Sequence, residues 1–279
     1  MDNGERDKRI SDLNARIAAH PGAREHATLS ALAKMVNSVF IPNWRELRVL
    51  LDTPSRDMNL AVELFQNVRR PDAREGYEGA VGRQLHNYVA SAMTVVAHAR
   101  RTMHGRTGEI ADEYVTRYKA VAVEPESAFI QGLRNFTLHH ALPFVGHTVH
   151  ISDPGTTPSA TVDIQLSSED LLSGDRWNAT ARTFIMRGNA VSLTPVIEVH
   201  GLLIVELHHW LLRALADANE PALGEVNELI VERTAALLDA DTERARMITA
   251  RWTAARQSPE PPADFEALLG NPRKQDEAA

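Results

Sequence analysis

The stretch from Phe129 to His140 concentrates polar groups whose chemistry suits a phosphodiester. Histidine, with a reference pKa of about 6.5, can take up or release a proton near neutral pH, as His139 or His140 would do here. The planar guanidinium of Arg134 can pair with two phosphate oxygens, and the amide of Asn135 can orient a ligand or an imidazole. These groups are typical of RNA cleavage without a metal ion, in which a base takes the ribose 2′-hydroxyl proton and an acid protonates the leaving oxygen.

A single helix, predicted to begin at Pro125 and to end before Pro143, must position these groups. Asn135 and His139 are four residues apart, so they share a helical face. Arg134 and His139 are five apart and point roughly 140° away from each other. Either Arg134 reaches around, or the helix begins near it, or a second copy of the chain completes the site, which would predict a symmetric dimer. The apolar residues expected to face the core are Phe129, Ile130, Leu133, Phe136 and Leu138.

The segment Arg134-Asn135-Phe136-Thr137-Leu138-His139 resembles the signature of the HEPN superfamily, an arginine, usually a polar residue, and a histidine after four to six intervening positions. Both His139 and His140 fit that spacing, and the resemblance covers roughly residues 57–140. It implies a bundle of four or five helices, often dimeric, whose active members are metal-independent ribonucleases. It also implies that Arg134 and His139 are catalytic, with Asn135 as the polar modulator. The stretches around Leu85-His86-Asn87-Tyr88 and Leu133-Arg134-Asn135 also resemble bacterial proteins without an assigned function.

A second interpretation is a non-catalytic helical interaction or scaffold protein, in which Arg134, Asn135 and His139 form a buried stabilising cluster. The formal net charge of −7 and the pI near 5.9 favour it, because such a chain lacks a broad basic surface for nucleic acid. Burial separates the two interpretations: sealed and paired side chains indicate a structural role. An open groove with Arg100 or Arg101 nearby favours an enzyme. The expected partners are accordingly RNA, a second copy of the chain or another protein.

Neither a metal nor a cofactor is expected. The chain has no cysteine, which excludes thiolate ligands, and no Gly-rich phosphate loop. Two histidine-rich groups lack the spacing of a helical metal site, in which histidines four apart are joined by a carboxylate. We interpret the first group as helix-packing residues and give metal binding little weight in both; they comprise Glu198, His200, Glu206, His208 and His209, and His139, His140, His147 and His150.

The fold is predicted to be mainly α-helical, with a HEPN-like bundle, a small β-hairpin and additional C-terminal helices. The longest helix should run from Pro71 to about His104, where Gly105 fits a C-terminal cap. One of its faces is polar, and it either faces solvent or lines a cleft beside the helix of the motif; it carries Asn87, Ser91, Thr94, His98 and Arg101. Further helices are expected at about 5–19, 24–38, 44–51, 57–68, 108–122, 178–187, 192–217 and 222–255, the last broken near 239–242.

Alternating apolar residues at 145–151 and 162–166 predict the hairpin, with Asp153-Pro154-Gly155 between its strands. Ser167, followed three residues later by Asp170, predicts a short capped helix. The expected segments are N-terminal helices at 1–56, the bundle at 57–142, the hairpin and short helix at 143–175, C-terminal helices packed on the bundle at 176–257, and a mobile tail at 258–279. No signal peptide or apolar run of about 18 residues is found, so we expect a cytoplasmic protein outside the membrane.

Overall fold

The computed structural model describes residues 2–65, 71–140, 143, 145–152 and 159–257. It confirms a mainly α-helical fold with a small antiparallel sheet of three strands in the order β1-β2-β3. The chain divides into two compact units, Met1–Ser38 with Leu215–Ala279, and Val39–Ala214. The five segments expected from the sequence follow chain order, whereas these units join the two ends of the chain. Because the two divisions differ in kind, the units do not test the boundaries of the five segments, which stay predictions.

The unit that joins the chain ends contains helices and no strand in its described part. Leu13 of α1 packs against Leu229 and Ala236 of α11 in a small apolar cluster. Asp239 adopts the left-handed conformation, with φ of 49°, and ends α11 where the sequence predicted a break. The helices of this unit are α1 (Asn3–Ala19), α2 (Ala23–Met35), α11 (Glu220–Leu238) and α12 (Thr242–Gln257). The predicted tail at 258–279 lies outside the described residues.

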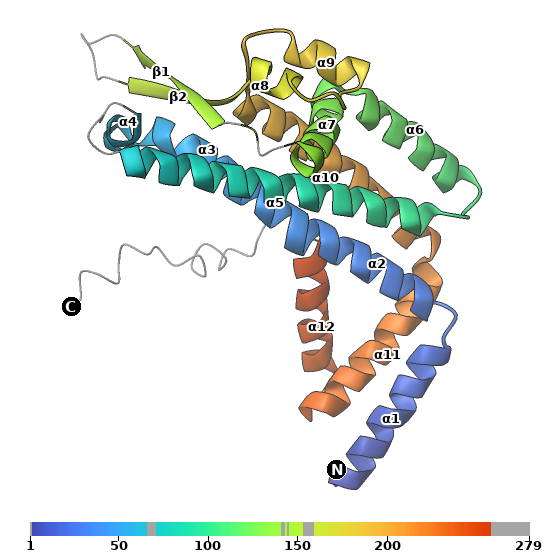
Figure 1. Ribbon diagram of the computed structural model, residues 1–279. Coiled ribbons are helices and arrows are strands. Elements are labelled where there is room, and N and C mark those ends of the chain that lie inside the picture. Colours follow the sequence, from blue (N-terminus) through green and yellow to red (C-terminus); the bar gives the residue numbers. More distant parts are fainter. Residues whose placement is uncertain (1, 66–70, 141–142, 144, 153–158, 258–279) are drawn as a thin grey trace, which may run out of the picture. The chain divides into compact units, whose positions relative to one another are not determined.

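The larger unit is arranged around α5 (Pro71–Met103), which contacts α3, α4, α7 and β1 (Figure 1). Gly105 follows α5 with φ of 75°, as its predicted role in ending the helix requires. None of the described helices in the chain is long and apolar enough to cross a membrane. The other helices are α3 (Ile41–Arg56), α4 (Met58–Phe65), α6 (Glu109–Val123), α7 (Pro125–His139), α8 (Ser168–Leu172), α9 (Ala179–Ile185) and most of α10 (Leu193–Ala218).

The predicted hairpin is confirmed. β1 (Val145–Ser152) pairs antiparallel with β2 (Ser159–Ser167), and β3 (Ala190–Ser192) adds a short third strand. The Ser167 hydroxyl accepts the Asp170 N–H at 3.3 Å and caps α8, as its spacing predicted. The proposed turn at Asp153-Pro154-Gly155 lies outside the described residues.

The helix expected at about 44–51 is longer in the structure, because α3 runs from Ile41 to Arg56 through Pro42 and Pro54, which the prediction had placed outside it. Pro42 lies in the first turn of α3, where its missing N–H costs little, directly after a π-helical turn at Val36–Phe40. Pro54 lies in the last turns and cannot donate to the Leu50 carbonyl. The Tyr77 hydroxyl donates to that carbonyl instead, at 2.8 Å, so this partly buried acceptor is satisfied.

The packing of α10 against α3 and α5 buries two polar contacts in the core. The Trp44 indole N–H donates to the Ile197 carbonyl at 2.9 Å, with its ring against Gly201. The Tyr88 hydroxyl hydrogen-bonds to His200 Nδ1 at 2.5 Å, and both side chains are buried. His200 is thus a packing residue, and no cluster of three or more histidine or acidic side chains in the described part of the chain is placed to hold a metal ion.

The buried histidines of α10 predict a stability that falls in mild acid. Burial lowers the pKa of His200 to about 3 and the pKa of His208 to about 4. In the unfolded chain these two histidines bind a proton below about pH 6.5, whereas in the folded chain they remain neutral until the pH approaches their lowered pKa values. Their contribution to stability is therefore greatest above pH 6.5 and decreases as the pH falls below it. Each histidine should cost about 1.4 kcal/mol at pH 5.5 relative to pH 7.5.

Urea unfolding at these two pH values measures the effect. The variant His200→Gln keeps an acceptor for the Tyr88 hydroxyl but cannot titrate, so its loss of stability at pH 5.5 should be about 1.4 kcal/mol smaller than in the wild type. Equal losses in the two proteins would contradict the assignment of the pH dependence to His200.

Candidate functional site

The motif lies on α7, whose apolar face packs into the core as predicted at four of the five expected positions. Phe129, Ile130, Leu133 and Phe136 are buried, whereas Leu138 is 55% exposed. Leu138 follows Leu133 by five residues and so points roughly 140° away from it, which explains why the prediction for this residue is wrong.

The polar residues of the motif are open to solvent. Arg134, His139 and His140 are exposed and Asn135 is half-buried. The side chains of Arg134 and His139 make no hydrogen bond or ion pair with another described residue. This arrangement differs from the sealed and paired cluster that a purely structural role would require.

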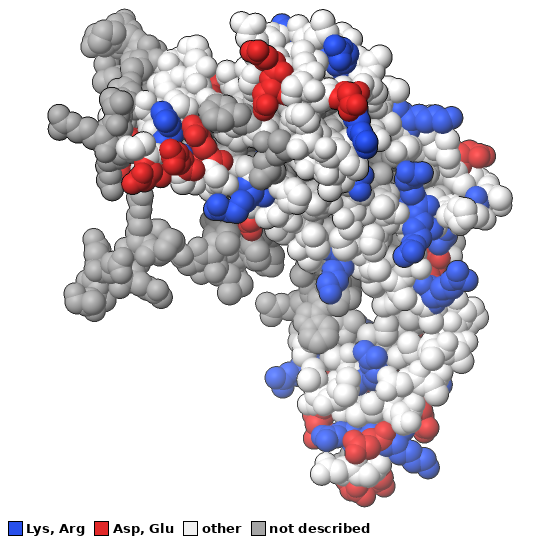
Figure 2. Space-filling model, viewed as in Figure 1, with Lys and Arg blue, Asp and Glu red and all other residues white. Residues whose placement is uncertain are grey.

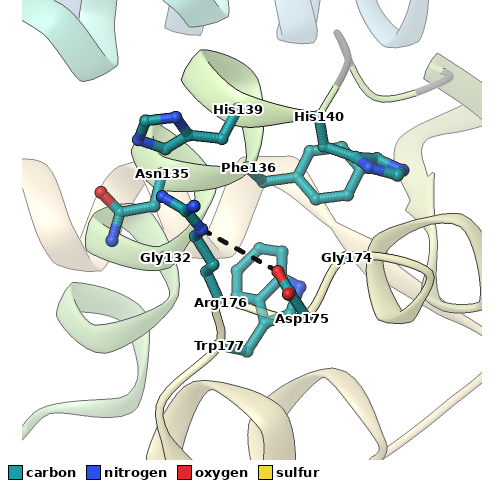
Figure 3. A pocket seen from close by; sticks show the side chains of 9 residues that line it. All are labelled: Gly132, Asn135, Phe136, His139, His140, Gly174, Asp175, Arg176 and Trp177. Atoms are coloured by element: carbon teal, nitrogen blue, oxygen red, sulfur yellow. Dashed lines mark ion pairs between the residues drawn. The ribbon is translucent and has the colours of Figure 1, made fainter.

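Two neighbouring pockets divide these residues between them. The first, here called the histidine pocket, has a volume of about 210 Å³ and contains Asn135, His139 and His140 (Figure 3). The second, here called the arginine pocket, has a volume of about 230 Å³ and contains Arg134 and again Asn135. Arg134 and His139 therefore line different pockets, as their angular separation on the helix implies, and among the described residues only Asn135 lines both.

An arginine from a later part of the chain, Arg176, also lines the histidine pocket. Figure 3 shows the guanidinium of Arg176 projecting towards Asn135 and His139. Its neighbour Asp175 lies 3.9 Å from Arg176 Nε, but both side chains are largely exposed, so this pair is weak. The pocket thus brings together two imidazoles, an amide and a guanidinium, with the Asp175 carboxylate beside the guanidinium.

His140 is held more firmly than His139. Its Nε2 lies 3.0 Å from Ser173 Oγ, and its ring packs 4.8 Å from the ring of Phe136. No comparable contact to a described residue holds the ring of His139, which leaves it free to follow a ligand.

Two glycines allow the segment of Arg176 to approach α7. A Cβ on Gly132 would overlap the ring of Trp177, and one on Gly174 would lie 2.7 Å from Phe136 Cδ2. The Trp177 indole N–H donates to the Leu171 carbonyl at 2.6 Å, which fixes the ring over Gly132. This packing sets the position of the adjacent Arg176.

The arginine pocket includes Arg100, which the sequence analysis named as a possible neighbour of the motif, but not the residues of the predicted polar face of α5. Arg100 of α5 lines it together with Met93, Val96 and Ala97. The predicted polar face of α5 does not line it: Asn87, Thr94 and Arg101 are exposed, His98 is half-buried and Ser91 is buried. The interpretation of that face as solvated therefore fits the structure, apart from Ser91. Figure 2 shows positive side chains over the C-terminal end of α5, the end that carries Arg100 and Arg101.

Sequence reasoning missed Arg176, because no local pattern links it to a motif 37 residues upstream. Comparison with known proteins adds no further assignment: no family model, curated protein or solved structure matches this chain. The geometry of the two pockets is consequently the basis for any statement about function.

Proposed function

We propose that this protein is an RNA-binding protein of HEPN type that cleaves RNA without a metal ion, with the histidine pocket as its active site. The observation that carries the proposal is the convergence of His139, Asn135 and Arg176 on one solvent-open pocket. An imidazole transfers protons near neutral pH, and a guanidinium and an amide stabilise the charge of a phosphate.

In the proposed reaction one histidine removes the proton of the ribose 2′-hydroxyl, and that oxygen attacks phosphorus. The bond from phosphorus to the 5′ oxygen breaks, and the leaving oxygen takes a proton from the second imidazole. His139 and His140 share these two roles. The products are a 2′,3′-cyclic phosphate and a 5′-hydroxyl, so protons and bonds balance without another reactant.

The proposal gives Arg134 a different role from the one that the HEPN resemblance implies. Arg176, rather than Arg134, shares the pocket of His139 and would bind the phosphate that is cut. Arg134, across Asn135, would bind a neighbouring phosphate of the same strand. We also propose a homodimer, in which Arg134 of a second copy of the chain would reach the histidine pocket of the first.

Arg176→Ala should lower the rate of RNA cleavage in EDTA about 10-fold to 100-fold, because a charged hydrogen bond to the phosphate contributes about 1.5–3 kcal/mol. Single-turnover cleavage of labelled single-stranded RNA measures the rate, and mass spectrometry identifies the cyclic phosphate. Arg182→Ala, at an exposed arginine of α9 that lines neither pocket, is the matched control and should leave the rate unchanged.

Cleavage by Arg176→Ala at the wild-type rate would reject Arg176 as the phosphate ligand. Failure of the wild-type protein to cut a pool of RNA of random sequence would reject the catalytic part of the proposal. Binding of that pool, weakened in Arg176→Ala, would then support an RNA-binding role alone.

A further inference from the structure

The arginine pocket has the charge distribution of an anion site. Arg100 of α5 and Arg134 of α7 line it, and both are exposed. No ion pair joins either guanidinium to a described side chain, and the described residues of the lining include no carboxylate. Two unpaired guanidiniums at one pocket favour a group with more than one negative charge, such as a phosphate.

The rest of the pocket is apolar and aromatic. Met93 and Val96 of α5 and Ile204 and Leu207 of α10 contribute aliphatic surface. The half-buried ring of Tyr118 stacks on Tyr114, with ring centroids 6.0 Å apart, and so lies in a fixed orientation at the pocket. A small-molecule site typically combines such a wall with a few polar groups, and a flat, weakly polar ring is the ligand body that fits it.

Hydrogen-bonding groups lie within the same lining. Gln131 and Asn135 contribute amides, and Ser127 contributes a hydroxyl. Ser127 is only 8% exposed, and its Oγ has no hydrogen-bond partner among the described residues. Because an unpaired buried hydroxyl is unfavourable, a ligand with hydrogen-bonding edges would be stabilised here, and a hydrocarbon chain would not.

We propose that the arginine pocket binds a mononucleotide, with the phosphate on Arg100 and Arg134 and the base against Tyr118. The edge of the base meets Gln131 and Ser127. This inference goes beyond the proposed cleavage of RNA, since it needs neither His139 nor a second pocket. It holds even if the protein cuts no RNA.

Equilibrium dialysis of the full chain against labelled AMP, CMP, GMP and UMP tests the proposal, with the four matching nucleosides, inorganic phosphate and decanoate as competitors. At least one nucleotide should bind saturably, about tenfold or more tightly than phosphate or its own nucleoside. Arg100→Ala and Arg134→Ala should each weaken this binding about tenfold, the effect of losing one charged hydrogen bond. Tyr118→Leu, which keeps apolar volume but removes the ring, should weaken it several-fold.

Matched controls assign the binding to this pocket. Arg101→Ala removes an exposed arginine one residue from Arg100, and Arg176→Ala removes the cation of the histidine pocket. Arg101→Ala should bind the nucleotide within about twofold of the wild type, and circular dichroism verifies that each variant is folded. A loss of nucleotide binding in Arg176→Ala but not in Arg100→Ala would move the ligand to the histidine pocket and overturn the proposal.

Three other results would also overturn it. Phosphate binding as tightly as every nucleotide would reduce the pocket to a simple anion site. Decanoate binding in place of nucleotides would assign it to aliphatic carboxylates. No saturable binding of any nucleotide up to millimolar concentration would reject a nucleotide ligand.

Discussion

Replacing His139 with alanine should lower the rate of RNA cleavage about a hundredfold to ten-thousandfold, the usual contribution of a positioned acid or base. His139 is exposed, lines the pocket with Asn135 and Arg176, and has a ring unrestrained by described neighbours. His140 contacts Ser173 and Phe136, so its ring has less freedom to follow the reacting oxygen. The loss should therefore appear mainly in the chemical step, with RNA affinity changed far less.

Single-turnover rates at saturating protein, in EDTA, separate the chemical step from binding. His104→Ala is the matched control, since His104 is an exposed histidine after α5 that lines neither pocket. It should cleave at the wild-type rate. Unchanged cleavage by His139→Ala, or an equal loss in His104→Ala, would remove His139 from the proposed mechanism.

Gly201→Ala should destabilise the larger unit by about 2–4 kcal/mol, despite the higher helix propensity of alanine. The added Cβ would overlap the indole of Trp44, a rigid ring whose N–H donates to the Ile197 carbonyl at 2.9 Å. Moving the ring loses that buried hydrogen bond and its packing, at about 1–3 kcal/mol for each. The gain in helix propensity is only about 1 kcal/mol, so the steric effect prevails.

Gly82→Ala is the matched control, because Gly82 lies inside α5 and a Cβ there would meet nothing within 4 Å. This variant should be as stable as the wild type or more stable, by up to about 1 kcal/mol. Urea unfolding with tryptophan fluorescence measures both variants. Equal stability of Gly201→Ala and the wild type would show that the α3–α10 contact can rearrange without cost.

The helices and the hairpin could largely be predicted from apolar spacing and caps, because those signals are local. Ser167 with Asp170 predicted α8, and the break at 239–242 coincides with the left-handed Asp239. Pro54 misled the prediction because its effect depends on Tyr77, a residue 23 positions away that satisfies the Leu50 carbonyl. A prediction made from the residues next to a proline cannot take such a distant partner into account.

The site could be predicted only in part, for a similar reason. The helical angle between Arg134 and His139 indicated that they do not meet on one face, and they line separate pockets. Arg176 could not be found, because its position depends on Trp177 packing over Gly132. Spacing along one helix predicts which side chains share a direction, whereas tertiary packing decides what comes to face them.

Because Asn135 lines both pockets, ligands bound in the two would be linked energetically through its side chain. Its amide offers two donors on nitrogen and one accepting oxygen, in a fixed plane. Two ligands that require opposite orientations of this plane would bind antagonistically, and two that accept the same orientation would not. By thermodynamic reciprocity, a ligand in one pocket changes the affinity of the other pocket by the same factor as the reverse. The affinity of each pocket would then depend on whether the other is occupied.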